Sequence, residues 1–217
     1  MTTDLRRDIE VTETTAPSVA EPARRSRSGM VLATLIAAGL FGLGCSVTGE
    51  AVTYDLPAES ARYTFEAETD GVKTQWEYLS AKPTADDVTK SQPCMGEVLG
   101  IEGECRPEPL IFLRYDLGLE LDNTVKAGSD HPITITGYYQ ERLSTPPTVT
   151  NMQVEASFDG GKTWQPVTVS AKGTNTFGAT IRNPKKDATG AVSLRTTASD
   201  SQGNTVKQTM PTAYRLS

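Results

Sequence analysis

Short runs of alternating apolar and polar residues, separated by turn-forming residues, fill most of the chain after residue 49. Residues 63–67 alternate in this way, and so do residues 72–78 beyond a turn at Asp70 and Gly71. Side chains of a strand point alternately to its two faces, so this period of two predicts strands with one buried face, joined as a hairpin. Residues 110–115 form an apolar run that predicts a strand buried on both faces.

Six further strands are predicted in the C-terminal part of the chain, separated by turns rich in Gly, Asn, Asp, Ser and Pro. No helical period lies between them, so the chain is predicted to be all-β. We expect an antiparallel immunoglobulin-like or fibronectin-like β-sandwich over residues 131–217, preceded by a smaller β subdomain over residues 50–130. The six strands are predicted at residues 133–139, 149–158, 164–169, 176–181, 192–199 and 204–214.

An uncharged run at residues 28–49 follows the basic cluster of Arg24, Arg25 and Arg27. Its length is about what a helix needs to cross the roughly 30 Å of bilayer hydrocarbon, and the arginines favour a cytoplasmic N-terminal side. We therefore expect one N-terminal membrane helix and a disordered cytoplasmic tail over residues 1–27. The β domains would then lie outside the cytoplasm, at the cell membrane.

Three processing routes are compatible with this run. An uncleaved signal anchor needs only the flanking arginines. In a bacterial lipoprotein, cleavage just before Cys45 would leave that residue lipidated, although Gly42 and Leu43 depart from the usual residues at their positions. A cleaved secretory signal is the third route, but no site of the Ala-x-Ala type follows the run. The signal anchor fits the sequence best, and lipidation of Cys45 stays open.

Cys94 and Cys105 flank a short stretch rich in Gly and Glu, and prolines lie just outside the pair. Export would place them in an oxidising compartment, where we expect a disulfide that stabilises the fold by about 3 kcal/mol. A zinc site would need more ligands than two cysteines with ten residues between them can supply, and no histidine is near. Residues 82–109 are therefore predicted to be a long loop held by the disulfide.

Residues 157–164 read S-F-D-G-G-K-T-W and match the Asp-box pattern S-x-D-x-G-x-T-W. In such a hairpin the aspartate can accept hydrogen bonds from turn amides, the second glycine permits a positive φ, and the tryptophan packs beneath the turn. A single copy predicts a structural hairpin, with a sugar-binding site as the alternative. The motif residues are Ser157, Asp159, Gly161, Thr163 and Trp164.

Ser129, Asp130 and His131 offer the residue types of a hydrolase triad, and His131 is the single histidine of the chain. A triad places the imidazole between serine and carboxylate, normally by bringing distant segments together, whereas sequence neighbours point in different directions. The chain also lacks a G-x-S-x-G elbow. We therefore interpret the three residues as a turn into the strand that follows Pro132.

Two acidic clusters are also predicted to be solvated loops. Asp86 and Asp87 are adjacent acids in a loop rather than the paired carboxylates of a glycosidase. The other cluster could supply oxygen ligands for calcium, but it lacks the alternating spacing and central glycine of an EF-hand loop. We expect no catalytic residue, no metal, no cofactor and no enzymatic activity. The residues of this second cluster are Asp116, Glu120, Asp122 and Asn123.

Four segments share the pattern and order of a known extracellular region. They are KTQWEY at residues 73–78, PLIFLRY at 109–115, VEASFDGGKTW at 154–164 and VSLRTTASD at 192–200, followed by GNT at 203–205 and Tyr214. With these segments, residues 54–216 resemble the noncatalytic C-terminal region of secreted bacterial subtilisin-like serine peptidases. The family's catalytic Asp, His and Ser signatures are not among them, so the resemblance implies an extracellular accessory module without proteolysis.

We expect a membrane-anchored, extracytoplasmic, noncatalytic module that contacts a protein or cell-wall component. Nucleic acid is not an expected partner, because the net charge is −6. One alternative is a carbohydrate-binding or cell-wall-binding β-sandwich lipoprotein, for which Trp76, Tyr138 and Tyr139 are the candidate aromatic platforms. Another alternative is a peptidase-associated subunit that acts with a separate catalytic chain.

Overall fold

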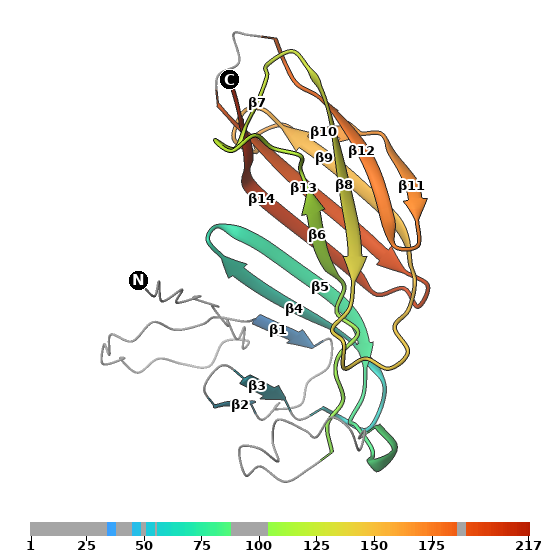
Figure 1. Cartoon of the computed structure of the whole chain (residues 1–217). Coiled ribbons are helices and arrows are strands. Elements are labelled where there is room, and N and C mark those ends of the chain that lie inside the picture. The colour runs from blue at the N-terminus through green and yellow to red at the C-terminus, as the bar shows by residue number, and fades with distance from the viewer. Residues whose placement is uncertain (1–33, 38–44, 49–50, 55, 88–103, 186–189) are drawn as a thin grey trace, which may run out of the picture.

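The computed structural model describes residues 34–37, 45–48, 51–54, 56–87, 104–185 and 190–217. Within these residues the chain forms strands and one short 3₁₀ helix, η1 (Ala85–Asp87), and no α-helix. The strands build an eight-stranded, a four-stranded and a two-stranded sheet (Figure 1). The predicted all-β class with antiparallel sheets is therefore confirmed for this part of the chain.

The eight-stranded sheet has the order β1, β4, β5, β14, β13, β9, β10, with β7 pairing with β14 beside this path. The pairing of β7 with β14 is parallel, and the other pairs in this sheet are antiparallel. The strands are β1 (Thr34–Ala37), β4 (Ala61–Thr69), β5 (Val72–Ser80), β7 (Thr124–Val125), β9 (Val149–Ser157), β10 (Gln165–Val167), β13 (Ala191–Asp200) and β14 (Thr205–Leu216).

The four-stranded sheet has the order β11, β12, β8, β6 and lies in front of β9, β13 and β14 in Figure 1. All its pairs are antiparallel. The small third sheet pairs β2 with β3. The strands of these two sheets are β2 (Cys45–Thr48), β3 (Ala51–Tyr54), β6 (Phe112–Asp116), β8 (Asp130–Tyr138), β11 (Val169–Gly173) and β12 (Thr176–Arg182).

The hydrophobic core is built from the alternate residues of both large sheets. In β8 the buried residues are His131, Ile133, Ile135 and Gly137, while the residues between them are partly or fully exposed. This is the period-two pattern that the sequence showed, with one face of the sheet turned toward the core. Ring and aliphatic side chains from the eight-stranded sheet complete the same cluster, among them Tyr63, Trp76, Val154, Leu194, Val206 and Tyr214.

The hairpin of β4 and β5 forms as the sequence predicted. Asp70 and Gly71 both have positive φ, of 52° and 76°, as a two-residue turn between twisted strands requires. β5, from the predicted subdomain at residues 50–130, also pairs with β14, from the predicted sandwich at residues 131–217. One sheet therefore contains strands from both predicted domains. The division into two domains stays a prediction, since strand pairing alone does not establish which segments fold independently.

The prediction of one strand at residues 164–169 is wrong. This segment contains β10, which pairs with β9, and the start of β11, which pairs with β12 in the other large sheet. The chain therefore crosses between the sheets at Thr168. Pro166 has no backbone N–H to donate, which suits a short strand at the edge of a sheet.

The prediction that residues 110–115 are buried on both faces is also wrong. Ile111 is fully buried, but it precedes β6, which is the edge strand of the four-stranded sheet. Arg114 in the middle of β6 is exposed. An apolar run of this length cannot by itself distinguish a central strand from an edge strand preceded by a buried residue.

Two described pieces of the uncharged run, β1 and β2, are short strands, and β1 pairs with β4. Most of residues 28–49 and all of residues 1–27 lie outside the described residues. Among the helices of the described segments, none has the length and apolar character needed to cross a bilayer. The membrane helix and the cytoplasmic tail therefore stay predictions.

Replacing Gly137 by Ala should destabilise the protein by about 1–3 kcal/mol, because the added methyl group would overpack the core. A Cβ at this position would lie 2.8 Å from Cγ2 of Val149, which is itself buried. Gly173→Ala is the matched control, since a Cβ there meets no atom within 4 Å. Urea denaturation of the two variants tests this expectation, and equal stabilities would contradict it.

Candidate functional site

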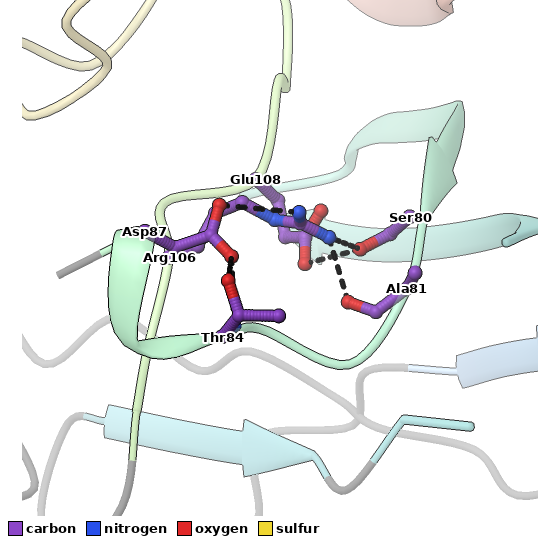
Figure 2. A network of polar contacts seen from close by, with 6 residues as sticks. All are labelled: Ser80, Ala81, Thr84, Asp87, Arg106 and Glu108. Atoms are coloured by element: carbon purple, nitrogen blue, oxygen red, sulfur yellow. Dashed lines mark hydrogen bonds and ion pairs between the residues drawn. The ribbon is translucent and has the colours of Figure 1, made fainter. Parts of the chain in front are cut away.

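Arg106 ties together two segments that flank the predicted disulfide loop (Figure 2). Its Nη1 lies 3.5 Å from Oδ1 of Asp87, and its Nη2 donates to the carbonyl oxygen of Ala81 at 2.6 Å and to Oγ of Ser80 at 3.1 Å. Asp87 is the last described residue before the gap at residues 88–103, and Arg106 follows Cys105. The ends of the loop are thus held together by a network of side chains, which we call the loop base.

Asp87 also closes the short helix η1. Its Oδ2 accepts hydrogen bonds from the backbone N–H of Thr84 at 2.7 Å and from the Thr84 hydroxyl at 3.0 Å. This is the T-x-x-D form of a capping box, in which a side chain three residues on bonds back to the first residue of the turn. The Thr84 amide lowers the pKa of Asp87 below its usual value, against the effect of burial, and Arg106 contributes further lowering.

Glu108 completes the loop base from the other side. Ser80, which is buried at the end of β5, donates from Oγ to Oε1 of Glu108 at 2.7 Å. The second carboxylate oxygen, Oε2, is buried and has no hydrogen-bond partner among the described residues. Burial raises the pKa of Glu108, although the Ser80 hydrogen bond and the charge of Arg106 act in the opposite direction.

The loop base positions a segment and shows no arrangement for catalysis. The Ser80 hydroxyl donates to a carboxylate, receives a guanidinium N–H, and is 3% exposed, so it is not a nucleophile open to substrate. Sequence analysis missed Ser80, Arg106 and Glu108, and it described Asp87 as a solvated acid. The T-x-x-D spacing at residues 84–87 could have predicted the hydrogen bonds of Asp87 to Thr84. The contacts of Arg106 and Glu108 join segments that are distant in the sequence, so no local pattern indicates them.

The predicted disulfide lies directly beside this network. Cys105 is half-buried and does not carry a free titrating thiol. Cys94 lies outside the described residues, so its pairing with Cys105 stays a prediction. Cys45 is part of β2, and its side chain is also outside what the structure describes, so its lipidation stays a prediction as well.

The Asp-box residues meet in the hairpin between β9 and β10. Oδ1 of Asp159 accepts from the backbone N–H groups of Lys162 and Thr163 at 3.0 and 2.9 Å, and Oδ2 accepts from the Thr163 hydroxyl at 2.6 Å. Ser157 Oγ donates to Oδ1 of Asp159 at 2.8 Å and accepts from Gly161 N–H, where φ is 85°. The Thr163 hydrogen bonds, followed by that of Ser157, hold the pKa of Asp159 well below its usual value.

Trp164 is half-buried and has a cation on its ring. The guanidinium carbon of Arg195 lies 4.4 Å from the ring centroid, and Arg195 Nε donates to Oε2 of Glu155 at 2.7 Å. Gly161 lies against the ring as well, since a Cβ there would be 3.5 Å from Trp164 Cζ2. The Trp164 ring is therefore packed against Arg195 and Gly161, which favours the structural interpretation of the Asp-box over a sugar-binding one.

Ser129, Asp130 and His131 do not assemble into a triad. Ser129 Oγ donates to the carbonyl oxygen of Lys126 at 2.6 Å, and Asp130 is exposed at the start of β8. His131 points into the core, where its ring packs edge-on against Tyr214 at 5.2 Å and its Nε2 has no partner among the described residues. The side chains of neighbouring strand residues thus diverge, as expected.

The oxygen-rich residues around β7 bond to their own loop. Asp116 Oδ1 accepts from the Gly118 N–H, and Asp122 Oδ1 accepts from both the N–H and the hydroxyl of Thr124. In the described part of the chain, no group of three or more His, Cys, Asp or Glu side chains is placed to hold a metal ion. These carboxylates therefore serve as local turn acceptors.

The three candidate aromatic platforms have different environments. Trp76 is buried and donates from Nε1 to the carbonyl oxygen of Ile111 at 2.7 Å, so it is not available as a platform. Tyr139 is half-buried, and its hydroxyl donates to Oδ2 of Asp200 at 2.9 Å. Tyr138 is 43% exposed and is the one candidate that faces solvent.

Comparison with known proteins does not assign the chain to a family. No family model matches it, and no curated protein matches it. The fold and the geometry described above therefore carry the functional argument.

The loop base predicts opposite pH profiles for two variants. The raised pKa of Glu108 means that its ionisation opposes folding, so wild-type stability is lost as pH rises from the ordinary carboxyl pKa through the raised one. Glu108→Gln keeps the acceptor for Ser80 and should gain stability relative to wild type as pH rises through this range. Asp87→Asn should lose stability at neutral pH, and this deficit should shrink on acidification, because the pKa of Asp87 is lowered.

Urea denaturation of the three proteins between about pH 2 and pH 7 checks both signs, because the Asp87 effect is lost below the ordinary aspartate pKa and the Glu108 effect develops above the ordinary glutamate pKa. Parallel stability profiles for wild type and Glu108→Gln would show that the carboxylate is not held in the desolvated position described here.

Proposed function

We propose that this chain is a noncatalytic binding module of the cell envelope, held at the membrane by residues 28–49 and exposed outside the cytoplasm. Its binding element is the loop between Cys94 and Cys105, and its partner is a protein or cell-wall component. One observation carries the proposal: the loop base holds both flanking segments with a guanidinium that bonds to Asp87, Ser80 and Ala81. A loop whose ends are fixed loses less conformational entropy when it binds.

The surrounding fold supports a passive role for the rest of the domain. The two large sheets are compatible with an immunoglobulin-like sandwich, which is a common scaffold for extracellular binding loops. The sequence resemblance to the accessory region of subtilisin-like peptidases agrees with an extracytoplasmic module. The same resemblance permits a subunit that assists a separate peptidase, and the partner recovered in the experiment below would distinguish these roles.

Capture of a partner by the full-length, detergent-solubilised chain from its own envelope fraction tests the proposal. The double variant Cys94→Ser, Cys105→Ser should lose most of the captured partner. Arg106→Met should also reduce capture, because it removes the loop base while leaving the cysteines in place. Lys162→Ala, an exposed change in the hairpin after β9, is the matched control and should bind as wild type does.

The melting temperature of each variant separates recognition from stability. A cysteine variant that captures the partner normally but melts at a much lower temperature would show that the loop serves stability alone. Proteolytic activity of the purified chain on general protease substrates would overturn the noncatalytic assignment.

A further inference from the structure

The outer face of the four-stranded sheet carries exposed and half-buried side chains around the end of β8, where the half-buried Phe112 also packs against Trp76. The pairing register places Phe112 opposite Tyr138, and Thr136 between Arg114 and Thr176. The neighbouring residues Ile135 and Gly137 are buried, so these side chains lie on the opposite, outer face. We call this surface the Tyr138 face; its residues are Phe112, Arg114, Thr136, Tyr138, Lys172 and Thr176.

Arg114 is held in place by an aromatic pair. Its guanidinium carbon lies 5.6 Å from the centroid of the Tyr138 ring, and the Tyr138 ring lies 5.6 Å from that of Phe112. Arg114 is exposed. The ion pairs found among the described residues involve other side chains, so no carboxylate of these residues neutralises its charge. A guanidinium that rests on a ring and keeps its donors free can bind an anionic oxygen of a ligand.

A second cation lies across the same face. The aliphatic part of Lys172 covers Gly178, where a Cβ would come within 2.7 Å of Lys172 Cε. Gly178 pairs with Thr134 on β8, so the lysine stem lies on the outer face beside the threonines. The register places two acidic residues on the outer face of this sheet: Asp116, opposite Thr134, whose Oδ1 accepts from Gly118 N–H, and Asp130, opposite Arg182. The cations Arg114, Lys172 and Arg182 therefore outnumber the two carboxylates.

The threonines between Arg114 and Lys172 present hydroxyl oxygens. Thr136 Oγ1 and Thr176 Oγ1 lie 3.4 Å apart, and Thr176 Oγ1 donates its hydrogen to the carbonyl oxygen of Thr174 at 3.1 Å. Each hydroxyl oxygen has two lone pairs, so both retain acceptor capacity for hydroxyl groups of a ligand. The face thus combines an aromatic ring, hydroxyl acceptors and two cations on one rigid sheet.

We propose that the Tyr138 face binds an anionic polysaccharide, with acid groups at Arg114 and Lys172 and sugar hydroxyls at Thr136 and Thr176. The Tyr138 ring would pack against a sugar ring. This inference rests on the proposed function and gives one chemical class of envelope ligand for a surface separate from the loop base. An anionic membrane surface is disfavoured, because the chain has a net charge of −6 and just two cations on the Tyr138 face.

Retention of the full-length, detergent-solubilised chain on immobilised polygalacturonate tests the proposal, with dextran as the neutral polymer and polyglutamate as the acidic peptide. Wild type should bind polygalacturonate, bind dextran poorly, and release as salt increases. Arg114→Gln should weaken binding roughly fivefold, as for one exposed ion pair. Asp116→Asn should tighten binding, because it removes an opposing charge.

Two more variants test the aromatic ring and the specificity of the site. Tyr138→Ala should weaken binding at least as much as Arg114→Gln, whereas Tyr138→Phe should bind as wild type does, because the ring is retained. Leu121→Ala, which changes a fully exposed side chain after β6, is the control. Equal binding to polyglutamate, or no effect of Arg114→Gln and Tyr138→Ala, would overturn the inference. If the wild-type chain did not bind polygalacturonate but still captured an envelope partner through the loop, this inference would be rejected and the proposed function would stand.

Discussion

The buried carboxylate of Asp200 connects the turn between β13 and β14 to the segment after β8, and its partner Asn204 extends this connection to β5. Its Oδ1 accepts from the backbone N–H groups of Gln202 and Asn204, and its Oδ2 accepts from the Asn204 side chain and the Tyr139 hydroxyl. Asn204 Oδ1 in turn accepts from the N–H of Leu79 in β5. A buried charge is tolerated when its hydrogen bonds are made, and these four are. The turn between β13 and β14 is thereby tied to β5 and to the segment after β8.

The positions of both candidate surfaces follow from this connection. Leu79, which bonds to Asn204, immediately precedes Ser80, the residue through which β5 enters the loop base. Tyr139, which bonds to Asp200, immediately follows Tyr138, the ring that supports Arg114. One satisfied carboxylate in the core thus fixes the backbone beside each surface. Recognition elements held by a rigid scaffold need less reorganisation when a ligand binds.

The sequence predicted those parts of the structure that depend on neighbours along the chain. The period of two located the strands, Asp70 and Gly71 located a hairpin, and the S-x-D-x-G-x-T-W pattern anticipated the contacts of Asp159 with nearby amides. It did not predict which strands share a sheet, because pairing is decided by nonlocal packing. For the same reason it missed the loop base, where Arg106 binds groups about twenty or more residues away.

The contrast between Glu108 and Asp200 gives a physical reason to regard the loop base as functional. Both are acids of a β domain, but Asp200 has four donors, whereas Glu108 has the Ser80 hydroxyl on one oxygen and a buried second oxygen that has no partner among the described residues. Burial raises the pKa of Glu108, so its ionised form opposes folding. A protein that needed only stability could place an apolar or neutral residue there. Incompletely satisfied charges concentrate at functional sites, and this one lies where the loop leaves the sheet.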